Sequence, residues 1–224
     1  MPWPLAFSIL LVSQARGAVV KPSAEVAQLL KKMRVAYSTL KSAHVTFQSH
    51  HFGNGTTITS TSECWFQAPN LVRVETKGIP GLTKPLYTLV SDGTQIHING
   101  LPGRPMTLMY SIDQMATNSP QMNLEVLCLW DWKRQLSTDI GGNMRLSTFG
   151  IHSDTWNGKK WTVLRETARS ANAVVDYYID PATFLMSRTI SSLINPRQTT
   201  IDVQVKKWAI NVPVDPSLFK LAAK

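Results

Sequence analysis

Glu63 and Glu75 are the two carboxylates in this sequence that are best placed to act together. They lie on predicted strands that neighbour each other, so their side chains could face one another across the strand pair. Two facing carboxylates can serve as a general acid and a general base. Two solvated carboxylates on a polar strand face are the simpler interpretation of the same spacing, and we favour it.

The five histidines do not have the spacing of a metal site. His50 and His51 are adjacent, and consecutive residues of a strand point to opposite faces. His44 and His50 share a face, but they stand about 20 Å apart in an extended strand. His97 and His152 have no acidic or sulfur partner nearby in the sequence. We therefore expect no metal ion and no other cofactor.

Sequence motifs of the common enzyme classes are also absent. The chain contains no GxSxG, no P-loop, no HExxH and no GxGxxG. Several acidic residues lie instead at predicted turns, where such side chains cap the backbone: Asp92, Asp154, Asp180 and Asp215. We therefore expect that the protein is not an enzyme.

The composition indicates a globular protein with an excess of positive charge. The chain has 224 residues, 43 % of them hydrophobic, and a formal net charge of +9. The basic residues occur in pairs at most, as at Lys31 and Lys32, without the aromatic or zinc-finger spacing of nucleic-acid-binding modules. We expect no nucleic-acid partner; a solvated positive face is better suited to anionic lipid headgroups.

The N-terminus has features of a signal peptide. An apolar run at residues 5–12 is followed by the small residues Ala15 and Gly17, although no Lys or Arg precedes the run. We expect residues 1–17 to be removed near Ala18 and the rest, 18–224, to be a soluble periplasmic domain. Cys64 and Cys128 then form one disulfide or remain two buried thiols, and the sequence leaves both open.

The hydrophobic periodicity predicts one helix followed by many strands. From Ser23 the apolar residues recur every three or four positions, as in an amphipathic helix. From Ala43 the period changes to two. Strands are expected at residues 43–50, 56–67, 71–75, 86–90, 95–99, 143–151, 160–169, 174–179, 185–194 and 199–210.

The interval 103–136 has a different character. It is rich in methionine and predicts two short helices that Pro120 divides. Such an insert completes the core permanently, or it closes as a movable lid over a cavity. The sequence leaves both possibilities open.

Three motifs in order carry a family resemblance: AHVTFQ at 43–48, CWFQAPNL at 64–71 and LVSDG at 89–93. Over roughly residues 23–100 the chain resembles the LolA-like superfamily of periplasmic lipoprotein carriers. The resemblance implies an α+β fold, an unclosed antiparallel β-barrel with an N-terminal helix and a helical lid or plug on the concave face. The barrel would have about ten strands.

The resemblance also implies a function. A carrier of this kind binds the acyl chains of lipoproteins or lipids in an apolar cavity and passes them between membranes. Membrane-bound donor and acceptor proteins would be its partners, and the carrier would be a monomer. The alternative is an envelope sensor or protein-interaction module of the same fold, with a plugged core and no cargo.

The resemblance suggests which residues form the cavity and its gate. In the family an Arg before the Pro-Asn of the second motif gates the cavity; here that position is Ala68, and Arg73 on the next strand is our gating candidate. The residues expected to line the cavity are apolar: Phe47, Trp65, Val72, Val74, Leu89, Ile98, Met109, Met115, Leu124, Leu127 and Trp130.

Overall fold

The computed structural model describes residues 22–53, 55–78, 87–100, 106–108, 147–168, 173–194 and 198–220. Its first element, helix α1 (Ala24–Ser38), begins at Ser23, whose hydroxyl oxygen accepts a hydrogen bond from the backbone N–H of Val26. The predicted helix is confirmed, and its buried side chains form one stripe: Val26, Leu29, Leu30, Met33 and Tyr37. Among the described residues, no helix is both long and apolar enough to cross a membrane.

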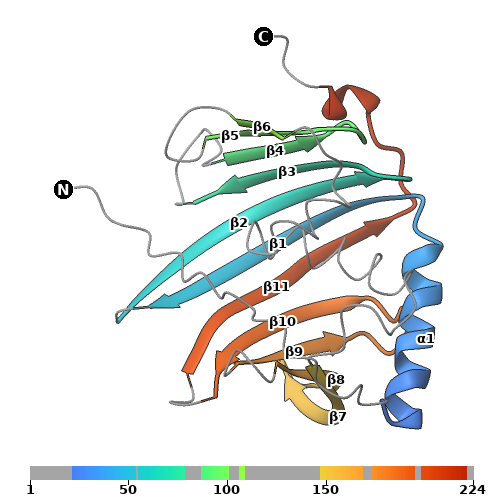
Figure 1. Ribbon diagram of the computed structural model, residues 1–224, viewed down its shortest axis with the longest axis vertical. Coiled ribbons are helices and arrows are strands. Elements are labelled where there is room, and N and C mark those ends of the chain that lie inside the picture. Colours follow the sequence, from blue (N-terminus) through green and yellow to red (C-terminus); the bar gives the residue numbers. More distant parts are fainter. Residues whose placement is uncertain are drawn as a thin grey trace, which may run out of the picture.

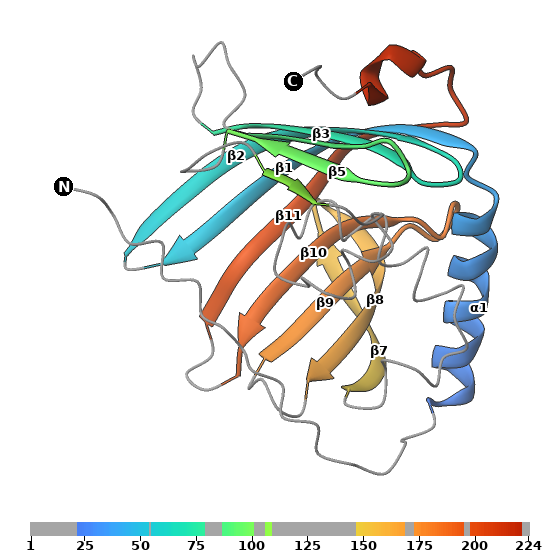
Figure 2. The same cartoon turned by 45° about the horizontal axis from the view of Figure 1, so that its top comes forward.

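Within the described ranges, eleven strands form one antiparallel sheet in the order β6-β5-β4-β3-β2-β1-β11-β10-β9-β8-β7. The strands β6 and β7 are its two edges, so the sheet is an unclosed barrel, as predicted. It curves around a concave side, with α1 standing at one end of the strands (Figures 1 and 2). The bounds are β1 (Ser42–Gly53), β2 (Thr56–Gln67), β3 (Leu71–Lys77), β4 (Tyr87–Ser91), β5 (Ile96–Asn99), β6 (Met106–Leu108), β7 (Ser147–Trp156), β8 (Lys159–Ala168), β9 (Ala173–Ile179), β10 (Met186–Leu193) and β11 (Gln198–Ile210). A short 3-10 helix, η2 (Pro216–Phe219), follows.

Alternation along the strands separates two faces of the sheet. On β1, Ala43, Val45 and Phe47 are buried, while the residues between them are half-buried. The buried side chains of α1 pack in one core with these three. We call the face that carries them the inner face, and the opposite one the outer face.

The predicted helical insert is wrong at its start. Residues Met106–Leu108 form strand β6, which pairs with β5 through Ile98 and Met106. The remaining insert residues, 103–105 and 109–136, lie outside the described residues, as do Cys128 and the predicted leader 1–17.

The second and third motifs of the resemblance contact each other in the fold. Asn70 donates a side-chain hydrogen bond to the carbonyl of Gly93 at 2.9 Å. Gly93 adopts a φ of 95°, and a Cβ there would lie 2.6 Å from Oδ1 of Asn70. The backbone conformation therefore favours glycine at this position, and a Cβ there would also displace the Asn70 amide.

Candidate functional site

The inner face carries rows of apolar side chains that cross several strands. In one row, Val45, Cys64, Val74, Leu89 and Ile98 lie abreast on β1 to β5, and each is at most 3 % exposed. A second row lies next to it, toward the start of β1: Ala43, Phe66, Val72, Ser91 and Ile96. All but Ser91 belong to the core that α1 joins.

Five of the predicted lining residues lie on this face and are buried: Phe47, Val72, Val74, Leu89 and Ile98. The other predicted lining residues except Trp65 lie outside the described residues: Met109, Met115, Leu124, Leu127 and Trp130. The structure therefore brings together the strand residues of the set other than Trp65.

Trp65 lies on the outer face, so the prediction that it lines the same space as Phe47 is wrong. It pairs with His44 and Arg73, whereas the inner-face residues on either side of it are Cys64 and Phe66. Its ring stacks on that of His44, with centroids 5.0 Å apart and planes 6° from parallel. Successive strand residues point to opposite faces, so the burial of Cys64 and Phe66 on the inner face places Trp65 on the outer one.

We expect Trp65→Ala to lower the free energy of unfolding by only about 1 kcal/mol, because the ring is half-buried and stacks on a single neighbour. Chemical denaturation measures this loss. Phe66→Ala, one residue along on the inner face, is the comparison and is expected to cost clearly more. A loss for Trp65→Ala as large as that for Phe66→Ala would contradict the assigned faces.

Arg73 also lies on the outer face, so it is not a gate for the inner side. Its guanidinium donates to Glu75 at 2.6 and 2.8 Å and to the carbonyl of Leu218 at 3.1 Å. Arg73 thus ties the C-terminal η2 to strand β3. The prediction that Arg73 gates the cavity is therefore wrong.

The carboxylates of Glu63 and Glu75 are register partners on β2 and β3, as predicted. Each has its own cationic or imidazole neighbour: Glu63 contacts His44 at 3.1 Å, and Glu75 contacts Arg73 at 2.6 Å. This arrangement fits surface pairing rather than a proton-transfer pair. In the described part of the chain, no three His, Cys, Asp or Glu side chains gather as metal ligands would.

On β1 to β3, the inner face becomes polar toward the strand ends that lie away from α1. The buried residues of these strands level with Phe47 or beyond it are Ser49, Ser60, Ser62 and Thr76. On the neighbouring strand β11, Val203 and Ile201 keep the same end apolar. The Ser62 and Thr76 hydroxyl oxygens lie 2.8 Å apart in a hydrogen bond. On β1 to β3, one end of the face is thus apolar and the other carries hydroxyl groups.

A pocket of about 350 Å³ opens between α1 and the strands β7 to β9. Its apolar wall combines Leu29 of α1 with Ile151, Ile179 and Phe184. Lys32 lies over the Phe184 ring, 5.0 Å from the ring centroid. The remaining lining residues are Glu25, Gln28, Thr162 and Pro181.

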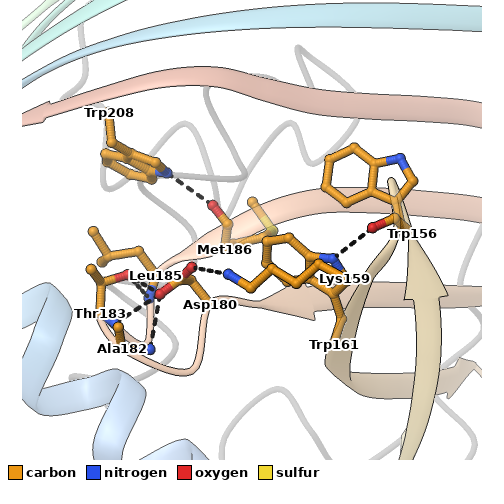
Figure 3. Close-up of polar contacts among 9 residues, drawn as sticks. All are labelled: Trp156, Lys159, Trp161, Asp180, Ala182, Thr183, Leu185, Met186 and Trp208. Atoms are coloured by element: carbon orange, nitrogen blue, oxygen red, sulfur yellow. Dashed lines mark hydrogen bonds and ion pairs between the residues drawn. The ribbon is translucent and has the colours of Figure 1, made fainter.

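Asp180 builds the turn that places Phe184 in this pocket. Its carboxylate accepts the backbone N–H groups of Ala182 and Thr183 and an ammonium hydrogen of Lys159 (Figure 3). Burial opposes ionisation of Asp180, but these hydrogen bonds outweigh it and lower its pKa. The carboxylate is therefore charged and holds the turn closed at neutral pH.

The outer face carries a second, smaller core over β7 to β10. Trp161 and Tyr178 are buried there and contact Trp156, whose carbonyl accepts the Trp161 indole N–H at 3.1 Å (Figure 3). The Arg188 guanidinium lies 4.9 Å from the Trp156 ring centroid and 5.2 Å from that of Tyr178. Asp202 binds Arg188 from β11 with two hydrogen bonds of 2.8 and 2.7 Å.

Sequence reasoning missed both the pocket and the outer-face core. For the pocket, the alternation of Phe149 and Ile151 with polar residues was a usable signal for an inner-facing strand. Nothing in the local sequence links Ile151 to Leu29 and Lys32, because the two segments are more than a hundred residues apart.

Comparisons with known proteins support the architecture. No family model and no curated protein matches the sequence. An uncharacterized conserved protein from Thermus thermophilus superposes with a TM-score of 0.53 at 11 % identity, covering 88 % of this chain and 94 % of that one. The chain therefore shares the fold of that protein over nearly the whole length of both.

Two further solved structures are similar at lower scores. A chain of the Pseudomonas aeruginosa MucA/MucB complex has a TM-score of 0.50 at 14 % identity, over 89 % of this chain. The match spans 62 % of that longer chain. A LolA superfamily protein from Nitrosomonas europaea has a TM-score of 0.40 at 9 % identity, over 87 % of this chain and 97 % of that one.

Proposed function

We propose that the protein binds the acyl chain of a lipid or lipoprotein against the inner face of its LolA-like sheet and carries it between membranes. The observation that carries this proposal is the change of the inner face on β1 to β3 from apolar near α1 to hydroxyl-bearing from the level of Phe47 onward. An amphiphile has the same two parts, an acyl chain and a polar ester or peptide head. The two ends of the face match these two parts.

Transfer of this kind asks the protein for burial rather than for bond chemistry. Each methylene taken from water contributes about 0.8 kcal/mol, so a dozen of them supply roughly 10 kcal/mol. The volume of the pocket, about 350 Å³, lies within the range of small-molecule sites, roughly 300–1,000 Å³. We place the far end of the acyl chain in this pocket, because its apolar wall continues into the core of the inner face through Leu29 and Ile179.

The proposed location is the periplasm. Residues 1–17 would direct export, and the domain from Ala18 onward would be soluble there. Membrane-bound donor and acceptor proteins would load and unload the carrier. Capture and release of a ligand is then the whole function, without catalysis.

Titration of the protein with a fluorescent fatty acid, which gives the Kd, tests the proposal. Ile151→Trp adds bulk inside the pocket, and we expect it to raise the Kd about tenfold, as is usual when a ligand pocket is filled. Ile190→Trp is the matched control, since Ile190 is equally half-buried but packs in the outer-face core. The Kd of the Ile190→Trp control is expected to stay within about twofold of that of the original protein.

Two results would count against an acyl-chain site at this place. One is unchanged binding by Ile151→Trp. The other is an equal loss for Ile151→Trp and Ile190→Trp, which would indicate general destabilisation. Thermal melts of both variants are recorded alongside to separate loss of fold from loss of binding.

A protein-interaction module is the second candidate. The specific observation in its favour is the similarity to a chain solved in the MucA/MucB complex, which is itself an assembly of two proteins. For this chain, the module would have an inner face filled permanently by its own side chains. Failure to bind any fatty acid in the titration would favour this candidate.

A further inference from the structure

Exposed apolar side chains gather at the strand ends farthest from α1. Of the six large hydrophobic residues that the described part of the chain exposes most, four lie at the tips of the β1–β2 and β10–β11 hairpins. We call these four the rim: Phe52, Ile58, Leu193 and Ile194, which are 37, 57, 37 and 43 % exposed. The other two, Val35 and Ile210, lie on α1 and at the opposite end of β11.

The register shows that the two tips belong to one edge of the sheet. His51 pairs with Ile58 on β2 and with Ile201 on β11, and Ile201 pairs in turn with Ser191 on β10. Four neighbouring strands therefore end together over a width of about 15 Å. Figures 1 and 2 both show these ends on the side of the sheet away from α1.

The rim side chains do not share one face of the sheet. Phe52 follows His51 on β1, and Ile58 is the cross-strand partner of His51, so Phe52 and Ile58 project to opposite faces. A flat protein partner would cover only one of them. A lipid interface into which the strand ends insert surrounds both at once.

Charge favours the same occupant. No Asp or Glu occurs among residues 26–62 or 181–201, the two stretches that contain the hairpin tips. The nearest carboxylate on β11, Asp202, is buried and bound by Arg188. The two stretches therefore carry no negative side chain that would repel an anionic surface. The net charge of +9 on the whole chain attracts such a surface.

We propose that the rim docks the protein on the surface of an anionic lipid bilayer, with the β1–β2 and β10–β11 tips inserted among the headgroups. The docking depends on the rim alone and does not require that the inner face hold an acyl chain. It gives a carrier or a sensor a fixed orientation at the membrane. The strand ends then point into the lipid, and α1 points away from it.

Co-sedimentation of the purified protein with vesicles of equimolar phosphatidylcholine and phosphatidylglycerol tests this docking. The double variant Ile58→Glu with Ile194→Glu places two charges at the rim, and its partition coefficient is expected to fall about tenfold. Ile58→Ser with Ile194→Ser keeps the net charge and is expected to fall as well, because the apolar contact is lost. Both positions are exposed, so the fold is retained and melting curves verify this.

The matched control is Val35→Glu with Ile210→Glu, which changes the net charge equally at exposed apolar sites away from the rim. Its partition coefficient is expected to stay within about twofold. Equal losses for the rim and control pairs would overturn the proposal, since net charge alone would then explain binding. Unchanged binding by the two rim variants would overturn it too.

Vesicle-free binding of the fluorescent fatty acid separates this proposal from the proposed carrier function. The rim variants are expected to bind the fatty acid as the original protein does. A loss of fatty-acid binding confined to the rim variants would overturn rim docking by making these residues part of the acyl site. Absence of fatty-acid binding in the original protein would count against the carrier function alone.

Discussion

Arg188→Met is expected to lower the free energy of unfolding by about 3 kcal/mol, because it leaves the Asp202 carboxylate buried without its cation. The side chains of the pair are only 17 and 9 % exposed. The same substitution removes the guanidinium that lies against Trp156 and Tyr178. Urea denaturation at neutral pH measures the loss.

The Arg188→Met effect should depend on pH in a defined direction. Burial alone would raise the pKa of Asp202, but the hydrogen bonds from Arg188 and Gln204 outweigh it and lower the pKa below 3.8. A lowered pKa in the folded protein stabilises it above the unfolded pKa, and this contribution is lost as the pH falls through the folded value. In Arg188→Met, the buried Asp202 carboxylate has lost its cation, so its pKa is expected to rise. The difference between the two proteins should therefore shrink in acid.

The pair Arg165–Asp176 provides the control for this prediction. It has the same bidentate geometry on the outer face, with distances of 2.7 and 2.6 Å, but the Arg165 side chain is 36 % exposed. Arg165→Met is expected to cost about 1 kcal/mol. Equal losses for Arg165→Met and Arg188→Met would contradict the role assigned to burial in the outer-face core.

Phe47→Ala is expected to cost about 3–5 kcal/mol, the usual loss when a buried aromatic ring is deleted. Phe47 is 0 % exposed at the point where the inner face changes from apolar to hydroxyl-bearing. The control is Phe52→Ala on the same strand, which is 37 % exposed and should cost no more than about 0.5 kcal/mol. Similar losses at both positions would contradict the assignment of the inner face as the core.

The elements of the fold followed from local patterns. Ser23 and the apolar stripe behind it gave the start of α1, since a cap and a 3.6-residue period are local signals. The alternation at Ala43, Val45 and Phe47 gave β1 in the same way. Strand β6 was missed because three residues are too few to show a period, and its pairing with β5 is a long-range contact.

The candidate site was only partly accessible from the sequence. Alternation tells which residues share a face, but not which face is buried, and this ambiguity put Trp65 on the wrong side. Its neighbours Glu63 and Arg73 were the available signal for the outer face, since charged residues are seldom buried. The pocket beside α1 joins Leu29 to Ile151 and Phe184, and that contact exists only after the sheet has folded back onto the helix.

Native mass spectrometry of the purified protein tests the central claim, acyl-chain binding by the inner face of the sheet, most directly. We predict a population with the added mass of an acyl lipid, which grows when fatty acid is supplied and is reduced in the Ile151→Trp variant. The Ile190→Trp variant should retain the added mass. Only the bare protein mass, before and after incubation with fatty acid, would contradict the account.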